Sequence, residues 1–381
     1  MLSLHTNAAS LSAQNALFRT ESRTATAMTR LGTGYRVNSA RDDAAGLQIA
    51  TRLVAQTHGM TVARSNIQKD ISILQTADGA LNESTTILIR MKDLAIQAAD
   101  GSATATDRDA MQAEYTALSH ELSNISSTTT FGGSKLLQGD TVAERAGVIA
   151  ATANAVANAA NAAAAHAAAM GAYNAAAAAD AAGSTQATQV ALAAALATAT
   201  AAAASSGVAA VAATDAQDYA AAVALVVAVN GKFSNAVWFQ IGASASETME
   251  FNLTPLLSDM HTALHAASTT YDTFGVQVKG RGTDLVLASV AATTIDQLQL
   301  ALDAVASVRS SLGSAVSRLN HSDNNLANTS ANTVRATGRI MDTDFAQESA
   351  EMLSNQMLMK AGSVVLRDSH SISTMLMSLL K

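Results

Sequence analysis

An apolar residue returns at every seventh position along the first third of the chain, and this repeat constrains the fold more than any other feature. Its members are Leu53, Met60, Ile67, Leu74, Leu81, Leu88 and Ala95. A seven-residue apolar repeat of this length predicts long helices that pack side by side as in a coiled coil. One proline in 381 residues leaves such helices uninterrupted.

A second run of the same spacing lies towards the other end, at Leu298, Val305, Leu312, Leu319 and Leu326. We call the large apolar residues of both runs, from Leu53 to Leu88 and from Leu298 to Leu326, the rod seam. Such a seam needs a partner. We therefore expect the N-terminal and C-terminal helices to pack on each other, with the middle of the chain inserted between them.

Both ends of the chain are apolar, although chain ends are normally polar and frayed. The start carries Leu2, Leu4, Leu11 and Leu17, and the segment "STMLMSLLK" closes the chain with Leu376, Leu379 and Leu380. Burying a leucine or methionine contributes about 1.5–3 kcal/mol, but two such helices alone cannot offset the entropy of ordering them. We predict ends that are disordered in the monomer and helical in a polymer.

The middle, from about Thr141 to Val229, is extremely rich in alanine. Because alanine has the highest helix propensity, we expect helices broken near Gly183 and near Ser205–Gly207, packed as a compact bundle with close contacts. A disordered tether is the alternative, which the near absence of charge and proline disfavours. The uncharged stretch Val190–Ala213 is long enough to span a membrane, but it is mostly Ala, with only two Leu and no Ile or Phe, and it has no Lys/Arg flank.

Short strand signals flank this middle zone. Turn glycines surround a short apolar run in Thr130–Asp140, and Ala236–Leu253 alternates apolar and polar residues as a strand pair would. A further strand candidate is Thr273–Val290, with a glycine-rich turn at Gly280–Gly282. These segments predict a small hairpin region beside the helical rod.

The sequence gives little evidence for a catalytic, metal-binding or phosphate-binding site. His261 and His265 have the i,i+4 spacing of a zinc-binding pair, but no third ligand is identifiable, and we expect surface histidines. The chain has no cysteine, and no nucleophile elbow or phosphate loop is present. A net charge of −7 without a basic block disfavours nucleic acid as a partner. We expect no enzyme, no cofactor, no metal and no membrane partner. No positive segment precedes an apolar one at the start, so we also expect no cleavable signal peptide.

The most specific stretch is "TRLGTGYRVNSARDDAAGLQIATRL", Thr29 to Leu53. Glycines break one helix, and Ser39 with Asp42 predicts a capping box for the next, with Asp42 and Asp43 in its first turn. The stretch closely resembles the N-terminal signature of bacterial flagellins. "FGGSKLLQGD", "FQIGASASETM", the long block from "VRSSLGSAVSRLN" onwards and the closing "MSLLK" resemble further blocks of that family, in the same order.

The resemblance implies a structural subunit of the flagellar filament, mainly α, with both chain ends paired as long antiparallel coiled-coil-like helices. It implies an inner layer (1–45 with 340–381), a helical rod with a β-hairpin (46–140 with 237–339) and a variable Ala-rich outer domain (141–236). Polymerisation is then expected to rest on Leu2, Leu4, Leu11, Leu17, Phe345, Leu353, Leu358, Val364, Leu366, Leu376, Leu379 and Leu380. It also implies export unfolded through the flagellar type III system, a chaperone on the C-terminal segment, and filament cap and hook-junction proteins as partners.

Two receptor surfaces follow from the same resemblance. Arg90, Leu94, Gln97 and Glu114 match the patch that Toll-like receptor 5 recognises on flagellins, although Leu94 also fits a packing role in the rod. Thr29–Ala50 is similar to the peptide that the plant flagellin receptor recognises, with departures at Tyr35 and Val37. The alternatives are a hook–filament junction protein and a flagellin with a protease in its variable domain, against which the absence of an HExxH motif speaks.

Overall fold

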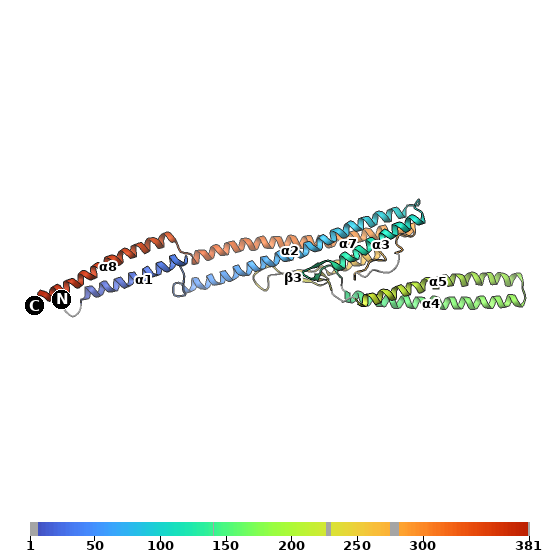
Figure 1. The fold of residues 1–381 in the computed structure, drawn as a ribbon, viewed down its shortest axis with the longest axis horizontal. Helices are drawn as coiled ribbons and strands as arrows, with labels where there is room; N and C mark the ends of the chain where they lie inside the picture. Colours follow the sequence, from blue (N-terminus) through green and yellow to red (C-terminus); the bar gives the residue numbers. More distant parts are fainter. Residues whose placement is uncertain (1–6, 140, 226–229, 275–281, 380–381) are drawn as a thin grey trace. The chain divides into compact units, whose positions relative to one another are not determined.

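The computed structural model describes residues 7–139, 141–225, 230–274 and 282–379, and these are mainly α-helical (Figure 1). The long helices are α1 (Ala8–Thr33), α2 (Ala44–Ala99), α3 (Ala105–Thr128), α4 (Thr141–Ala182), α5 (Gln186–Leu225), α7 (Ala288–Met341) and α8 (Phe345–Leu379). The prediction of a mainly α fold built on long helices is confirmed.

The chain forms two compact units. Unit 1 comprises Met1–Asn66, Ile241–Glu247 and His321–Lys381, and unit 2 comprises Ile67–Gln240 and Thr248–Asn320. Each of α2 and α7 contributes one part to each unit. Within unit 1, Arg64 of α2 forms an ion pair with Asp323 of α7, with 2.8 Å between Nε and Oδ1.

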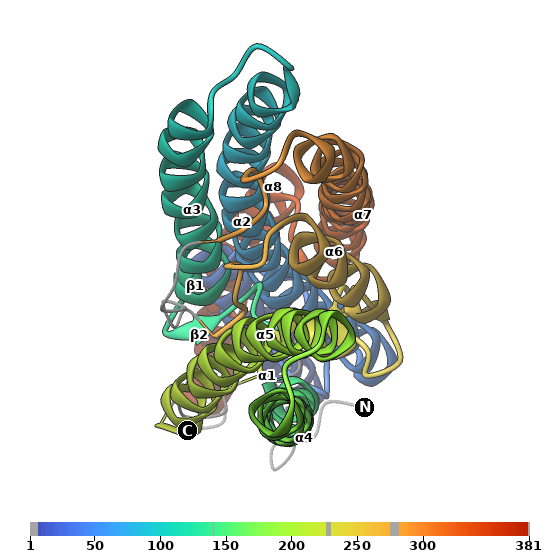
Figure 2. The same cartoon turned by 90° about the vertical axis from the view of Figure 1, so that its right-hand side faces the viewer.

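Unit 2 contains a helical core made by its parts of α2 and α7 with α3 and the short α6 (Thr254–Ala267), seen end-on in Figure 2. The Arg309 Nε on α7 donates to Asp78 of α2 over 2.9 Å, and the Lys92 ammonium of α2 donates to Gln299 of α7 over 2.6 Å. The Tyr115 hydroxyl of α3 donates to the Ala267 carbonyl at the end of α6. Polar contacts therefore join α2 to α7 and α3 to α6 around an apolar centre.

Two antiparallel hairpins accompany this core. β1 (Thr130–Phe131) pairs with β2 (Ser134–Lys135), and its turn holds Gly132 and Gly133 at φ of 58° and 82°, which favours glycine. β3 (Val237–Gln240) pairs with β4 (Thr248–Phe251) and is preceded by the short helix η1 (Lys232–Ser234), as the alternation in Ala236–Leu253 predicts. The third strand candidate is wrong in the described residues. Residues 273–274 and 282–287 form no strand, and α7 begins at Ala288. Residues 275–281 lie outside the described residues.

α4 and α5 form an antiparallel helical hairpin (Figure 1). The predicted break at Gly183 is confirmed, because the chain turns between Ala182 and Gln186. The predicted break at Ser205–Gly207 is wrong, since α5 continues through it. Both serine hydroxyls donate to the carbonyl three residues earlier, and one glycine costs only about 1 kcal/mol in a helix so rich in alanine.

The predicted capping box of α2 is also wrong. Ser39 and Asp42 close a local turn in which the Asp42 carboxylate accepts from the Ser39 N–H and hydroxyl, and α2 begins later, at Ala44. Asp43 caps α2 by accepting from the Gly46 N–H at 2.8 Å. A Cβ on Gly46 would collide with that carboxylate, so glycine at this position permits the cap.

The expectation of a surface His261 is wrong as well. Its ring is buried, with Nε2 at 2.9 Å from the Leu137 carbonyl and Nδ1 at 2.8 Å from the Tyr271 hydroxyl. Because a carbonyl only accepts, Nε2 carries the proton and Nδ1 accepts from the tyrosine. Burial lowers the pKa of His261 to about 4. His265, by contrast, is exposed, and the described residues contain no cluster of metal-ligating side chains.

Candidate assembly surface

The residues between α1 and α2 meet those between α7 and α8 in unit 1. Gly34 ends α1 with φ of 79°, and its N–H donates to the Arg30 carbonyl over 2.8 Å. Its own carbonyl accepts from the Thr343 N–H over 3.0 Å, and Tyr35 pairs with Asp342 in an antiparallel bridge. Backbone hydrogen bonds therefore join the end of α1 to the start of α8.

Asp344 caps α8 at this junction. Its carboxylate accepts from the Ala346 N–H at 2.9 Å and the Gln347 N–H at 3.1 Å, which satisfies donors that a helix start leaves free. The Gln347 amide then donates to Glu351 one turn further on, over 3.2 Å. The start of α8 is thus fixed by its own sequence.

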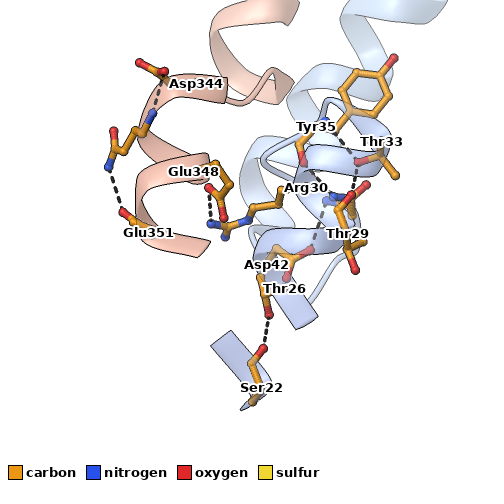
Figure 3. Close-up of polar contacts among 12 residues, drawn as sticks. Ser22, Thr26, Thr29, Arg30, Thr33, Tyr35, Asp42, Asp344, Glu348 and Glu351 are labelled. Carbon is orange, nitrogen blue, oxygen red and sulfur yellow. Dashed lines mark hydrogen bonds and ion pairs between the residues drawn. The ribbon is translucent and has the colours of Figure 1, made fainter. Parts of the chain in front are cut away.

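An ion pair joins the two helices beside the junction. The Arg30 guanidinium lies 3.4 Å from the Glu348 carboxylate, which is largely buried (Figure 3). Hydrogen bonds from the side chain and backbone of Ser39, together with the charge of Arg30, hold the pKa of Asp42 below its usual range. Both carboxylates lie beside the end of α1, where Arg30 supplies the positive charge.

Small side chains let α1 and α8 approach each other along their length. Ala27 and Thr24 are the buried residues of the last part of α1. A Cβ on Gly362 of α8 would lie 3.3 Å from a methyl of Leu17, so this glycine allows a close contact. Near the other end of the pair, the Asn7 amide donates to the Ser369 carbonyl and hydroxyl, each over 3.2 Å.

The outward faces of the two helices carry large apolar side chains with nothing over them. Phe18 is 64% exposed, Leu353 53% and Leu358 55%. The full exposed set on these helices is Leu11, Phe18, Met28, Phe345, Leu353, Met357, Leu358, Val364, Val365 and Met375. Isolated exposed leucines are ordinary, but ten large exposed apolar side chains on one helix pair are typical of an interaction surface, which we call the apolar surface of this pair.

The residues expected to drive polymerisation fall into three groups. Leu11, Phe345, Leu353, Leu358 and Val364 are exposed, whereas Leu17 and Leu366 are half-buried. Leu2, Leu4 and Leu380 lie outside the described residues, and so do the side chains of Leu376 and Leu379. The expectation did not include Phe18, Met28, Met357, Val365 and Met375. Phe18 follows Leu11 at the seven-residue spacing, and Met357 precedes Val364 by the same interval.

A groove of about 400 Å³ adds to the apolar surface of unit 1. It lies between the start of α2 and the end of α7, and its lining includes Tyr35, Ala50, Val54 and Val334. Three of these, Tyr35, Val54 and Val334, are large side chains that stay substantially exposed.

Most residues of the rod seam are buried, within the two units. Met60, Ile67, Leu74, Leu81 and Leu88 on α2 are buried, as are Leu298, Val305, Leu312 and Leu319 on α7; Leu53 and Leu326 are half-buried. The seven-residue spacing places each set on one face of its helix.

The residues that match the receptor patch divide between surface and core. Arg90 Nη2 lies 2.7 Å from Glu114, and both side chains are about half exposed. Gln97 is exposed. Leu94 is only 2% exposed, so in this conformation it packs within the rod and is not available to a partner.

Paired helices that leave large apolar side chains uncovered, in a chain whose other long helices carry a buried apolar seam, define a structural protein that completes its core by association. Comparison with known families agrees. Residues 4–141 match the bacterial flagellin N-terminal helical region, and residues 295–380 match the bacterial flagellin C-terminal helical region. The chain belongs to the bacterial flagellin family.

Curated relatives match over the whole chain. It is 34% identical to flagellin A of Vibrio anguillarum and 33% identical to flagellin A of Vibrio cholerae, each over 100% of both chains. A solved flagellin of Bacillus cereus aligns with a TM-score of 0.37 and 20% identity, covering 69% of this chain and 88% of that one, which is too distant to carry any residue over.

Proposed function

We propose that the chain is the structural subunit of a flagellar filament and that it assembles through the outward faces of α1 and α8. The observation that carries this is the exposed apolar surface on a helix pair already joined by backbone hydrogen bonds at one end. Membership of the flagellin family and full-length similarity to named flagellins support it. The flagellin matches favour a filament subunit over a hook–filament junction protein.

The exposed area makes association favourable. Covering a fully exposed leucine or phenylalanine contributes about 1.5–3 kcal/mol, so covering the ten exposed residues of the helix pair can offset the roughly 4–15 kcal/mol lost in fixing two copies together. Within the filament, we expect each subunit to contribute three layers: an inner layer from 1–45 with 340–381, a rod from 46–140 with 237–339, and an outer domain from 141–236. The filament lies outside the cell, and its subunit is a structural protein without an enzymatic role.

The further partners belong to the same proposal. Export unfolded through the type III system, a chaperone on the C-terminal segment, the filament cap and the hook-junction proteins follow from family membership. Motility is then the filament's role. For Toll-like receptor 5, the exposed Arg90, Gln97 and Glu114 are the available part of the patch, and the plant flagellin receptor would recognise Thr29–Ala50.

Polymerisation of purified protein tests the assembly surface. Wild-type chain seeded with short filament fragments should sediment as long tubes that electron microscopy shows. Leu353→Glu should abolish growth, because it places a charge on the apolar surface. Val208→Glu is the matched control, since Val208 is also apolar and exposed, at 73% against 53% for Leu353, but lies on α5. Unimpaired growth of Leu353→Glu would refute assembly through this face.

A further inference from the structure

The α4–α5 hairpin has long stretches without charge. Residues 146–179 and 186–214 contain no Asp, Glu, Lys or Arg. The segment Gln186–Ala221 has a mean hydropathy of 1.5 in its most apolar part, and only 6% of that part is buried. By length and composition it passes as a membrane span, yet it lies open on the hairpin surface.

The two helices meet along a seam of small residues. Half-buried or buried positions recur at alternating intervals of four and three: Thr152, Ala155, Ala159, Ala162, His166, Ala169 and Tyr173 on α4, and Leu192, Ala195, Ala199, Ala202, Ser206, Ala209 and Ala213 on α5. The Thr152 hydroxyl donates to the Ala216 carbonyl over 3.3 Å, which fixes the antiparallel register. This is a coiled-coil repeat with alanine in place of leucine.

The two flanks of this seam differ. One line on α4 carries Ile149, Val156, Ala163 and Met170 at intervals of seven, and the corresponding line on α5 carries Leu196, Ala203 and Ala210. In an antiparallel pair the two lines lie on the same side of the seam, and we call this side the apolar flank. Ile149 is 61% exposed, and Leu196 47%.

The opposite flank is made of smaller and more polar residues, apart from Val208 of α5, which lies one helix turn from Ser205 and is exposed. Its lines carry Ala151, Asn158, Ala165 and Ala172 on α4 with Thr198, Ser205 and Ala212 on α5. Asn154 and Asn161 lie next to them, one helix turn from Asn158. The large exposed residues of α4 are therefore gathered on one side of the hairpin.

The size of the apolar flank fits a protein interface. A helix of 34 residues is about 50 Å long and about 10 Å wide, so a face two helices wide offers on the order of 1,000 Å². Specific interfaces bury about 800 Å² on each partner. The flank has no charge that would remain unpaired when it is covered.

We propose that the apolar flank docks against the same flank of a second copy of this chain. The inference rests on the proposed function, because a filament holds copies close together and raises their effective concentration. A lipid surface fits less well: the hairpin has no Trp or Lys, its one arginine is Arg145 near one end, and its two tyrosines are Tyr173, in the seam, and Tyr219, which donates to Asp272 over 2.6 Å. Two such hairpins pack as an antiparallel four-helix bundle.

Cysteine cross-linking tests the contact, because the chain has no cysteine of its own. Val156→Cys and Met170→Cys place a thiol on the apolar flank, and Asn158→Cys and Ala172→Cys place one on the opposite flank of the same helix. After mild oxidation of assembled filaments, the first pair should give several-fold more disulfide-linked dimer than the second. Equal yields from both flanks, or no dimer from either, would overturn the proposal.

Two variants that each introduce one charge give a second test of the docking. Ala163→Glu on the apolar flank should lower the hydrogen-exchange protection of α4 and α5 in filaments but not in the monomer, whereas Ala165→Glu should change neither. Equal effects of the two variants count against the proposal, as does flotation of wild-type monomer with phosphatidylglycerol vesicles. Filaments that form without cross-links refute the docking alone. A wild-type chain that forms no filaments refutes the assembly function, and the docking with it.

Discussion

The α2–α7 pair of unit 2 and the α4–α5 hairpin have the same seven-residue periodicity, but they differ in how much apolar side chain their seams bury. The rod seam buries Leu74, Leu81 and Leu312 almost completely. The hairpin seam is built on residues such as Ala199 and Ala213, which bury a single methyl each. Each additional buried CH₂ contributes about 0.8 kcal/mol, so equal numbers of turns give very different free energies. The repeat specifies where helices meet, and side-chain size decides how much that meeting stabilises.

The comparison predicts its largest effect in the rod seam. Leu81→Ala and Leu312→Ala should each lower the free energy of unfolding by about 2–5 kcal/mol, because each leaves a cavity in a fully packed core. Chemical denaturation, monitored by hydrogen exchange in peptides of α2 and α7, would measure this loss of stability. Ile89→Ala is the control, since Ile89 is half exposed on the same helix. An equal loss in the control would remove the distinction between seam and surface.

Acid should weaken the core of unit 2 through His261. Its folded pKa of about 4 lies below the ordinary value of 6.5, so the unfolded chain binds the proton first as pH falls. Stability from this group is present above pH 6.5 and is lost as pH falls towards 4. His261→Gln should flatten the pH dependence of the melting temperature across that window. A slope unchanged by the substitution would show that other groups cause it.

In the hairpin seam, by contrast with the rod seam, a larger side chain should be destabilising. Ala199→Leu adds bulk to a buried position in the hairpin, and we expect a loss of about 1–3 kcal/mol because the helices must move apart. Ala197→Leu, two residues earlier and exposed, should be nearly neutral. Hydrogen exchange in α4 and α5 would report both. If Ala199→Leu were neutral as well, the hairpin would not depend on close approach.

The smallest expected effect compares two glycines of α2. Gly79→Ala should raise stability by up to about 1 kcal/mol, since alanine is the better helix former and no atom lies within 4 Å of its Cβ. At Gly59 the new Cβ would lie 2.8 Å from the Ala243 Cβ, so Gly59→Ala should instead lower stability by roughly 1 kcal/mol. Thermal unfolding of the two variants would show the opposite signs.

The sequence determined which segments are helical and which faces of α2 and α7 are buried, because a period of seven leaves only one stripe for a partner. It also determined the family, through the blocks Thr29–Leu53 and "FGGSKLLQGD". These signals are local in sequence, and local propensity together with periodicity is enough to detect them.

Only the tertiary structure decided the rest. The sequence pattern could not place Asp43 as the cap of α2, because Ser39–Asp42 had the same spacing and formed a turn instead. It could not bury His261, whose partners Leu137 and Tyr271 come from other segments of unit 2. Nor could it show the uncovered faces of α1, α8 and the hairpin, because exposure depends on what packs against a helix. Where stability arises from contacts distant in sequence, only folding in three dimensions defines them.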